Sequence, residues 1–157
     1  MSVLHPANPT PAALIVETYW TEHQHQERVV DWCRYDSPLP LRLRAAQIYA
    51  IPNGGHRHPA VAAKLKAEGV TPGIPDLHLP IATGREHGLY IEMKKIGGRP
   101  DPEQIRKLAE LRRNGYRAVL AVGWREAVAI ITDYLEQGDP PPTAPPCRPH
   151  RYRRQTK

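Results

Sequence analysis

Two stretches of the chain, GIPDL at residues 73–77 and LYIEMK at residues 89–94, determine the predicted fold. Both are short and largely apolar, and the polar residues 83–88 between them predict a turn, so the pair is interpreted as a β-hairpin. Side chains alternate between the two faces of a strand. Glu92 and Lys94 are therefore expected on one face of the second strand, with the apolar residues on the other.

An acidic site is predicted where the two strands lie side by side. Asp76 opens the first strand, so its carboxylate is expected close to that of Glu92. Two clustered carboxylates form a hard oxygen site that suits Mg²⁺ or Mn²⁺. Such an ion can polarise a phosphodiester and activate a water, and Lys94 can hold that water or neutralise charge on the phosphate. The alternative is that Glu92 and Lys94 form an exposed ion pair at a strand edge.

Helices and strands alternate through residues 20–138, which predicts an α/β fold with a mixed central sheet flanked by helices. Thr21 predicts a helix start, and Asp101 followed by Pro102 predicts another. The predicted helices are one after Thr21, then Pro59–Glu68, the helix after Asp101 as far as Asn114, and Arg125–Glu136; the predicted strands are Ala45–Ile51, Asp76–Pro80, Leu89–Lys95 and Tyr116–Val122.

Both ends of the chain differ in composition from its centre. The chain has 157 residues and a net charge of +6. Residues 139–157 hold six prolines and five basic residues against one acidic residue, so this tail carries +4 and residues 1–138 carry +2. Such a composition predicts a disordered basic tail. Three prolines among the first eleven residues predict an irregular segment over residues 1–19, which leaves residues 20–138 as the folded domain.

Several classes of protein are excluded by composition. No apolar run approaches the roughly 20 residues of a membrane-spanning helix. The N-terminal residues lack the basic start and apolar stretch of a signal peptide, so a cytoplasmic location is expected. The two cysteines, Cys33 and Cys147, are too few for a disulfide framework or a four-thiolate zinc site. The positive charge permits a polyanionic partner without identifying one.

The order of Pro75-Asp76 and Glu92-Met93-Lys94 resembles the PD-(D/E)XK nuclease superfamily. More closely, the chain resembles the VRR-NUC nucleases, a branch related to archaeal-type Holliday junction resolvases, from about Thr21 to Gln137. The further segments that carry this resemblance are Ile51-Pro52-Asn53-Gly54-Gly55, Lys66-Ala67-Glu68-Gly69, Gly73-Ile74-Pro75-Asp76-Leu77 and Gln104. The resemblance implies a restriction-endonuclease-like core and a DNA endonuclease that depends on Mg²⁺ or Mn²⁺.

The resemblance also implies roles for individual residues. Asp76 and Glu92 would bind the metal together with the backbone carbonyl of Met93. Lys94 would be catalytic, and Gln104 would help to position the substrate or Lys94.

A glutamate on the first helix completes the site in this family. Glu22 fits best, because Gln26 follows it one turn later on the same helix face. It would act on the metal directly or through a water. Glu27 is the alternative, and both could instead be solvated acids of the first helical turn.

The expected partner is DNA, either branched (a junction or a flap) or duplex. The resemblance implies a homodimer, as in junction resolvases, and a symmetric junction suits a two-fold protein. The resemblance further implies a bacteriophage or prophage gene whose product acts in the bacterial cytoplasm. His23 and His25 are interpreted as surface groups. The residues expected to contact DNA are Asn53, Gly54, Gly55, Arg57, Lys66 and Arg99.

Two other functions stay open at this point. The chain could be a non-catalytic DNA-binding module with a vestigial site. It could also be an accessory protein that its basic tail tethers to a replication or packaging complex.

Overall fold

The computed structural model describes residues 10–52 and 59–138. Its centre is one four-stranded sheet in the order β1-β2-β3-β4. The first two strand pairs are antiparallel and the pair β3–β4 is parallel, so the predicted mixed sheet is confirmed. The strands are β1 (Tyr49–Ala50), β2 (Leu77–Leu79), β3 (Leu89–Lys94) and β4 (Arg117–Val122).

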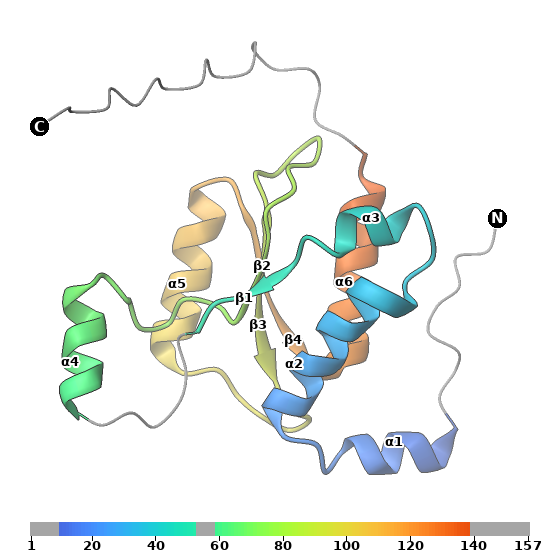
Figure 1. Cartoon of the computed structure of the whole chain (residues 1–157), viewed down its shortest axis with the longest axis horizontal. Coiled ribbons are helices and arrows are strands. Elements are labelled where there is room, and N and C mark those ends of the chain that lie inside the picture. Colours follow the sequence, from blue (N-terminus) through green and yellow to red (C-terminus); the bar gives the residue numbers. More distant parts are fainter. Residues whose placement is uncertain (1–9, 53–58, 139–157) are drawn as a thin grey trace, which may run out of the picture.

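Helices cover both faces of this sheet, as the α/β prediction requires (Figure 1). The helix that connects β3 to β4, α5, lies on one face, whereas α2, α3 and α6 lie on the other; α4 stands away from the sheet. Within the described residues, no helix is long and apolar enough to cross a membrane. The helical elements are α1 (Pro11–Glu17), α2 (Glu22–Asp31), the π-helical η1 (Trp32–Asp36), α3 (Leu41–Ala45), α4 (Pro59–Ala67), α5 (Pro102–Arg113) and α6 (Gly123–Glu136).

The core lies between the sheet and helices α2 and α6. Ile91 and Met93 of β3 are fully buried there, together with Val29 of α2 and Ile131 of α6. Because strand side chains alternate, this packing directs the side chains of Tyr90, Glu92 and Lys94 to the opposite face. The expected division of β3 into an apolar and a polar face is confirmed.

The expectation of an irregular segment over residues 1–19 is wrong where the structure describes it. Residues 11–17 form helix α1. Pro11 stands at its first position, where proline needs no backbone N–H, and the Thr10 hydroxyl accepts a hydrogen bond of 3.3 Å from the Ala13 N–H. Proline marked the start of a helix here. Residues 1–9 lie outside the described residues.

Two other predicted boundaries are corrected. The expected strand Ala45–Ile51 is only two residues long, Tyr49–Ala50, because Ala45 ends helix α3. A short apolar run is compatible with either a helix or a strand, and its periodicity does not distinguish them. Helix α6 begins at Gly123, two residues before the predicted Arg125.

Helix α1 is joined to α6 by an ion pair. Glu17 is buried, and its carboxylate accepts hydrogen bonds of 2.8 and 3.0 Å from the Arg125 guanidinium. Burial alone would raise the pKa of Glu17, but this guanidinium and the Trp124 side chain hold it below its ordinary value. Glu17 is therefore an ionised group that depends on its partner.

We expect Arg125→Met to lower the free energy of unfolding at pH 7 by about 2–3 kcal/mol, because it leaves the Glu17 carboxylate buried without its counter-charge. Urea denaturation measures this change. Arg113→Met, at an exposed position of α5, is the matched control and should change stability by less than about 0.5 kcal/mol. Equal losses in the two variants would contradict the assigned role of the ion pair.

Candidate metal centre

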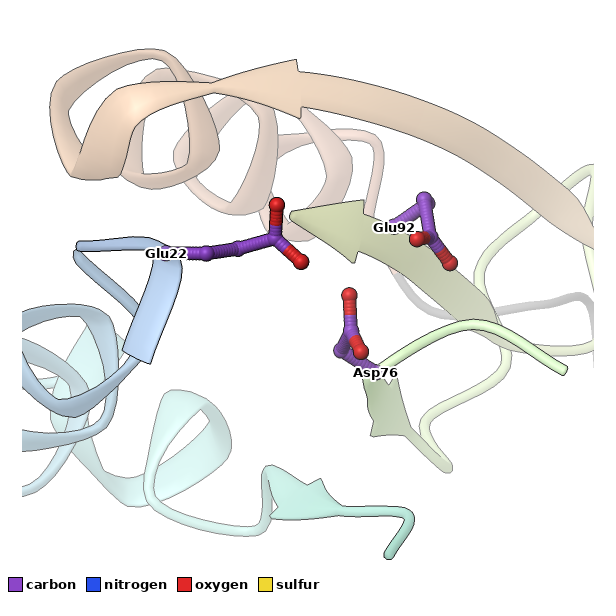
Figure 2. A group of neighbouring side chains, drawn as sticks. All are labelled: Glu22, Asp76 and Glu92. Carbon is purple, nitrogen blue, oxygen red and sulfur yellow. The ribbon is translucent and has the colours of Figure 1, made fainter. Parts of the chain in front are cut away.

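Three carboxylates from separate elements converge at one end of the sheet. Glu22 comes from the first turn of α2, Asp76 from the residue before β2, and Glu92 from β3 (Figure 2). One oxygen of each carboxylate lies within 4.8 Å of the other two. Glu92 is 1% exposed, and Glu22 and Asp76 are partly buried. Residues far apart in the sequence therefore form one compact group of acids.

The local sequence positions Glu22. Thr21 caps α2: its hydroxyl accepts from the Gln24 N–H (3.2 Å), and the Gln24 side chain accepts from the Thr21 N–H (2.8 Å). This reciprocal pair fixes the start of the helix, as a capping box does. Glu22 is the first helical residue, where the positive end of the helix dipole favours a carboxylate.

The segment before Asp76 runs directly against the start of α5. Gly73 has a φ of +77°, and a Cβ on it would lie 3.1 Å from the backbone of Glu103. Glycine is therefore needed at this position, both for its left-handed conformation and for the close contact. The contact brings Asp76 and the first turn of α5 to the same end of the sheet.

Asp76 is held against β3 by a backbone hydrogen bond. Its Oδ2 accepts from the Met93 N–H at 2.8 Å. The hairpin thus places the Asp76 carboxylate beside the strand that carries Glu92, as expected from the sequence.

Lys94 lies among the acids. Its Nζ donates to Glu92 Oε1 at 2.8 Å, to Glu22 Oε1 at 3.2 Å and to the Met93 carbonyl at 2.8 Å. The Lys94 side chain is only 8% exposed, and β3 lies between β2 and β4 rather than at an edge of the sheet. The alternative of an exposed ion pair at a strand edge is therefore wrong.

Gln104 reaches the same carboxylate from the first turn of α5. Its Nε2 donates to Glu92 Oε1, and its own Oε1 accepts from the Asp101 N–H at 2.9 Å. In return the Asp101 carboxylate accepts from the Gln104 N–H at 2.9 Å. Asp101 therefore orients the Gln104 amide so that its N–H points at Glu92. We identified Asp101 from the sequence only as a cap; its spacing of three residues from Gln104 is the signal for this second role.

The surroundings of Asp76 and Glu92 disfavour the ionised form of both carboxylates. Burial raises the pKa of Glu92 to about 7, with the charges of Asp76 and Glu22 adding to the shift and Lys94 opposing it. Burial also raises the pKa of Asp76, against the lowering effects of the Met93 N–H and Lys94. The pKa of Lys94 is raised as well: burial would lower it, but Glu92 and Glu22 outweigh that effect. One lysine does not neutralise three carboxylates.

The donor set fits a divalent metal ion. Carboxylate and carbonyl oxygens are the ligands that Mg²⁺ and Mn²⁺ prefer. The carboxylates of Glu22, Asp76 and Glu92 supply the charge. The Met93 carbonyl lies beside them, because it accepts a hydrogen bond from the same Lys94 Nζ that donates to Glu92.

His25 corrects our expectation of a surface group. Its ring is fully buried, and Nδ1 accepts from the backbone N–H of Trp124 at 3.3 Å. Burial lowers the pKa of His25, which favours the neutral ring that this hydrogen bond requires. The contact ties α2 to α6 one turn after Glu22, so His25 helps to fix the helix that carries the third acid.

The other predicted site residues are not brought together with the acids in the part of the chain that the structure describes. Glu27 is exposed and pairs with His23 at 3.2 Å. Lys66 on α4 and Arg99 after β3 are exposed. Outside the described residues lie the predicted DNA contacts Asn53, Gly54, Gly55 and Arg57 and the basic tail 139–157.

A known family and a solved structure match this chain. The model of the VRR-NUC domain matches residues 11–124, well over half of the chain. The chain belongs to the VRR-NUC family. A solved structure described as a "VRR_NUC domain protein" is 34% identical to this VRR-NUC chain, covers 78% of it and 93% of its own length, and superposes with a TM-score of 0.67. None of the curated proteins is significantly similar.

Family membership makes this VRR-NUC chain a nuclease-type domain with the expected fold. The family match begins at Pro11, the first residue of α1. Helix α1 therefore lies within the matched region, although we expected the domain to begin near residue 20.

Proposed function

We propose that this VRR-NUC protein is a DNA endonuclease that depends on Mg²⁺ or Mn²⁺ and hydrolyses phosphodiester bonds. The observation that carries the proposal is the convergence of Glu22, Asp76 and Glu92 around Lys94. Three carboxylates would repel a phosphate, so a nuclease built on them needs a divalent ion between protein and substrate.

Asp76 and Glu92 would hold the ion with the Met93 carbonyl, and Glu22 would bind it directly or through a water. When bound, the ion would polarise the phosphodiester and lower the pKa of a water molecule. Lys94 donates to both Glu92 and Glu22, so its ammonium lies beside the proposed metal ligands. It would hold the water or neutralise charge that develops on the phosphate.

Gln104 acts through Glu92 in this proposal. Its amide donates to Glu92 Oε1, which leaves the other carboxylate oxygen free of this contact. Gln104 is thus a positioning residue, oriented in turn by Asp101.

The wider DNA surface stays a prediction. We propose that Lys66 and Arg99, both exposed, contact the DNA backbone. The same role is proposed for Asn53, Gly54, Gly55 and Arg57. Branched or duplex DNA as the partner, the homodimer, the cytoplasmic location and the phage origin are proposals of the same kind.

The proposal is tested by incubating the protein with duplex, flap and four-way-junction DNA in Mg²⁺ or Mn²⁺. We expect cleavage of at least one substrate, abolished by EDTA. A DNA-binding module without catalysis would bind DNA and cleave none of the three substrates with either ion. If the chain is instead an accessory protein tethered by its tail, deletion of residues 139–157 would abolish its association with the replication or packaging complex. The deletion would leave catalytic activity unchanged.

The first-helix acid can be assigned by a matched pair of variants. We expect Glu22→Gln to weaken Mn²⁺ binding by about 10-fold or more, because it removes one carboxylate from the group. Glu27→Gln should bind Mn²⁺ as the wild type does, since Glu27 is exposed and paired with His23. Isothermal titration calorimetry measures both, and the reverse order of effects would assign the role to Glu27.

Metal binding should depend on pH around neutrality. Glu92 has a pKa of about 7 in the metal-free protein, and an ion must displace its proton. Mn²⁺ affinity should therefore fall by about 10-fold from pH 8 to pH 6, and binding at pH 7 should release about half a proton from this group. Titration in buffers of different ionisation enthalpy measures the proton count. An affinity that stays constant across this range would exclude Glu92 as a ligand with this pKa.

A further inference from the structure

A row of aromatic side chains crosses the sheet beside the acids. Tyr49 of β1 pairs with His78 of β2, which pairs with Tyr90 of β3. His78 follows Asp76 by two residues and Tyr90 precedes Glu92 by two residues, so His78 and Tyr90 lie on the same face of the sheet as these acids. We call Tyr49, His78, Tyr90 and Tyr116 the aromatic strip.

The rings of the aromatic strip are fixed by one another. His78 stacks on Tyr90 with ring centroids 4.1 Å apart and planes inclined by 11°. Tyr49 packs edge-on against His78, and its hydroxyl lies 2.5 Å from Nδ1 of that ring. Tyr116 and Tyr90 pack edge to face, with ring centroids 5.3 Å apart. Little side-chain entropy is left to lose when a ligand packs against such a group.

The aromatic strip is not part of the hydrophobic core. The core face of β2 and β3 carries aliphatic side chains and Met93, all fully buried. The strip lies on the other face, where its members are partly exposed and Tyr49 is 45% exposed. It contains three of the seven tyrosines in a chain that has no phenylalanine. Aromatic cross-strand pairs also stabilise sheets, so packing alone is the competing explanation.

Two residues along a strand span roughly 7 Å. A phosphate held at the acids would therefore place the adjoining nucleotide beside the aromatic strip. Aromatic rings bind nucleobases by stacking, whatever the base. Bases inside a duplex are already stacked and paired, so only an unpaired base can reach a ring on the sheet.

We propose that the aromatic strip binds an unpaired nucleobase next to the phosphodiester at the acids, and that the protein thereby selects DNA with an unpaired nucleotide at the cleavage position. This inference rests on the proposed nuclease function. Tyr49, at the exposed end of the strip, provides the ring that is open to the ligand.

The test measures DNA binding without cleavage. Labelled oligothymidine and a blunt duplex are titrated with the full chain in EDTA, and fluorescence anisotropy gives the two affinities. We expect Tyr49→Leu to weaken binding of the single strand at least fivefold, the fold-change of a stack worth about 1 kcal/mol, and to leave duplex binding unchanged. Tyr35→Leu is the matched control: Tyr35 is 66% exposed, on η1 away from the strip, and should change neither affinity.

A second variant separates stacking from folding. Tyr49→Trp keeps a flat aromatic surface and should retain single-strand affinity even if the packing of β1 changes. Single-strand affinity unchanged in Tyr49→Leu, or lost equally in Tyr49→Leu and Tyr49→Trp, would overturn the inference and leave sheet packing as the role of the strip.

Cleavage is then measured separately in Mn²⁺, on a duplex and on the same duplex with a single-nucleotide gap. Faster cleavage beside the gap, reduced by Tyr49→Leu, supports the inference. Equal cleavage of both by the wild type would overturn it. If Tyr49→Leu lowers single-strand affinity but the wild type cleaves neither DNA, the strip stands as a nucleobase site and the nuclease proposal fails.

Discussion

Asp76→Asn should lower the rate of DNA cleavage by at least about 10³-fold, which corresponds to about 4 kcal/mol of lost transition-state stabilisation. The variant has nearly the same shape and keeps an oxygen that can accept from the Met93 N–H. It lacks the negative charge that would hold the ion. Single-turnover cleavage at saturating Mn²⁺ measures the rate.

The same variant should not lose stability. Burial raises the pKa of Asp76, so ionisation of this group opposes folding above its unfolded pKa. At pH 8 without metal, Asp76→Asn should therefore be at least as stable as the wild type, and it should lose the thermal stabilisation that Mn²⁺ gives the wild type. Asp31→Asn, an exposed position on α2, serves as the control with wild-type cleavage. Equal rates for Asp76→Asn and Asp31→Asn would refute the proposed role.

Lys94→Met should separate metal binding from catalysis. Lys94 Nζ contacts both Glu92 and Glu22, so its removal eliminates a cation that competes with the metal for these oxygens. Mn²⁺ affinity should be unchanged or higher. Cleavage should fall by about 10²- to 10³-fold, the range seen when one group that stabilises transition-state charge is removed.

Stability provides a second signature of Lys94→Met. Glu92 loses its buried counter-charge, which should cost about 3 kcal/mol at pH 8 without metal. Saturating Mn²⁺ should restore part of that loss, because the ion supplies the missing positive charge. Lys95→Met, at the exposed neighbouring position, should match the wild type in all three measurements. If Lys94→Met lost both Mn²⁺ binding and DNA cleavage, Lys94 would only maintain the structure.

Local signals predicted those parts of the fold that local interactions determine. The caps at Thr21 and Asp101 mark the starts of α2 and α5 because a capping side chain bonds to backbone within three residues. The apolar and polar faces of β3 follow from strand alternation alone. Helix α1 and the short strand β1 were mispredicted because a proline or an apolar run is compatible with more than one local structure.

The candidate site likewise combines a contact that local sequence predicts with one that depends on tertiary packing. A hairpin brings Asp76 beside β3, so this contact could be predicted from the spacing of two neighbouring strands. The position of Glu22 depends on how α2 packs against the sheet and α6, partly through the buried hydrogen bond that the Trp124 backbone N–H donates to His25. No local pattern encodes that tertiary contact, which is why the sequence left Glu22 and Glu27 as alternatives and His25 was placed at the surface.

The anomalous-scattering map of a crystal equilibrated with Mn²⁺ tests the central claim most directly, namely that the three acids hold a divalent ion. We predict an anomalous peak among the carboxylates of Glu22, Asp76 and Glu92, with the Met93 carbonyl among its ligands. A map with Mn²⁺ bound only elsewhere, or with no peak at these acids at saturating concentration, would contradict it.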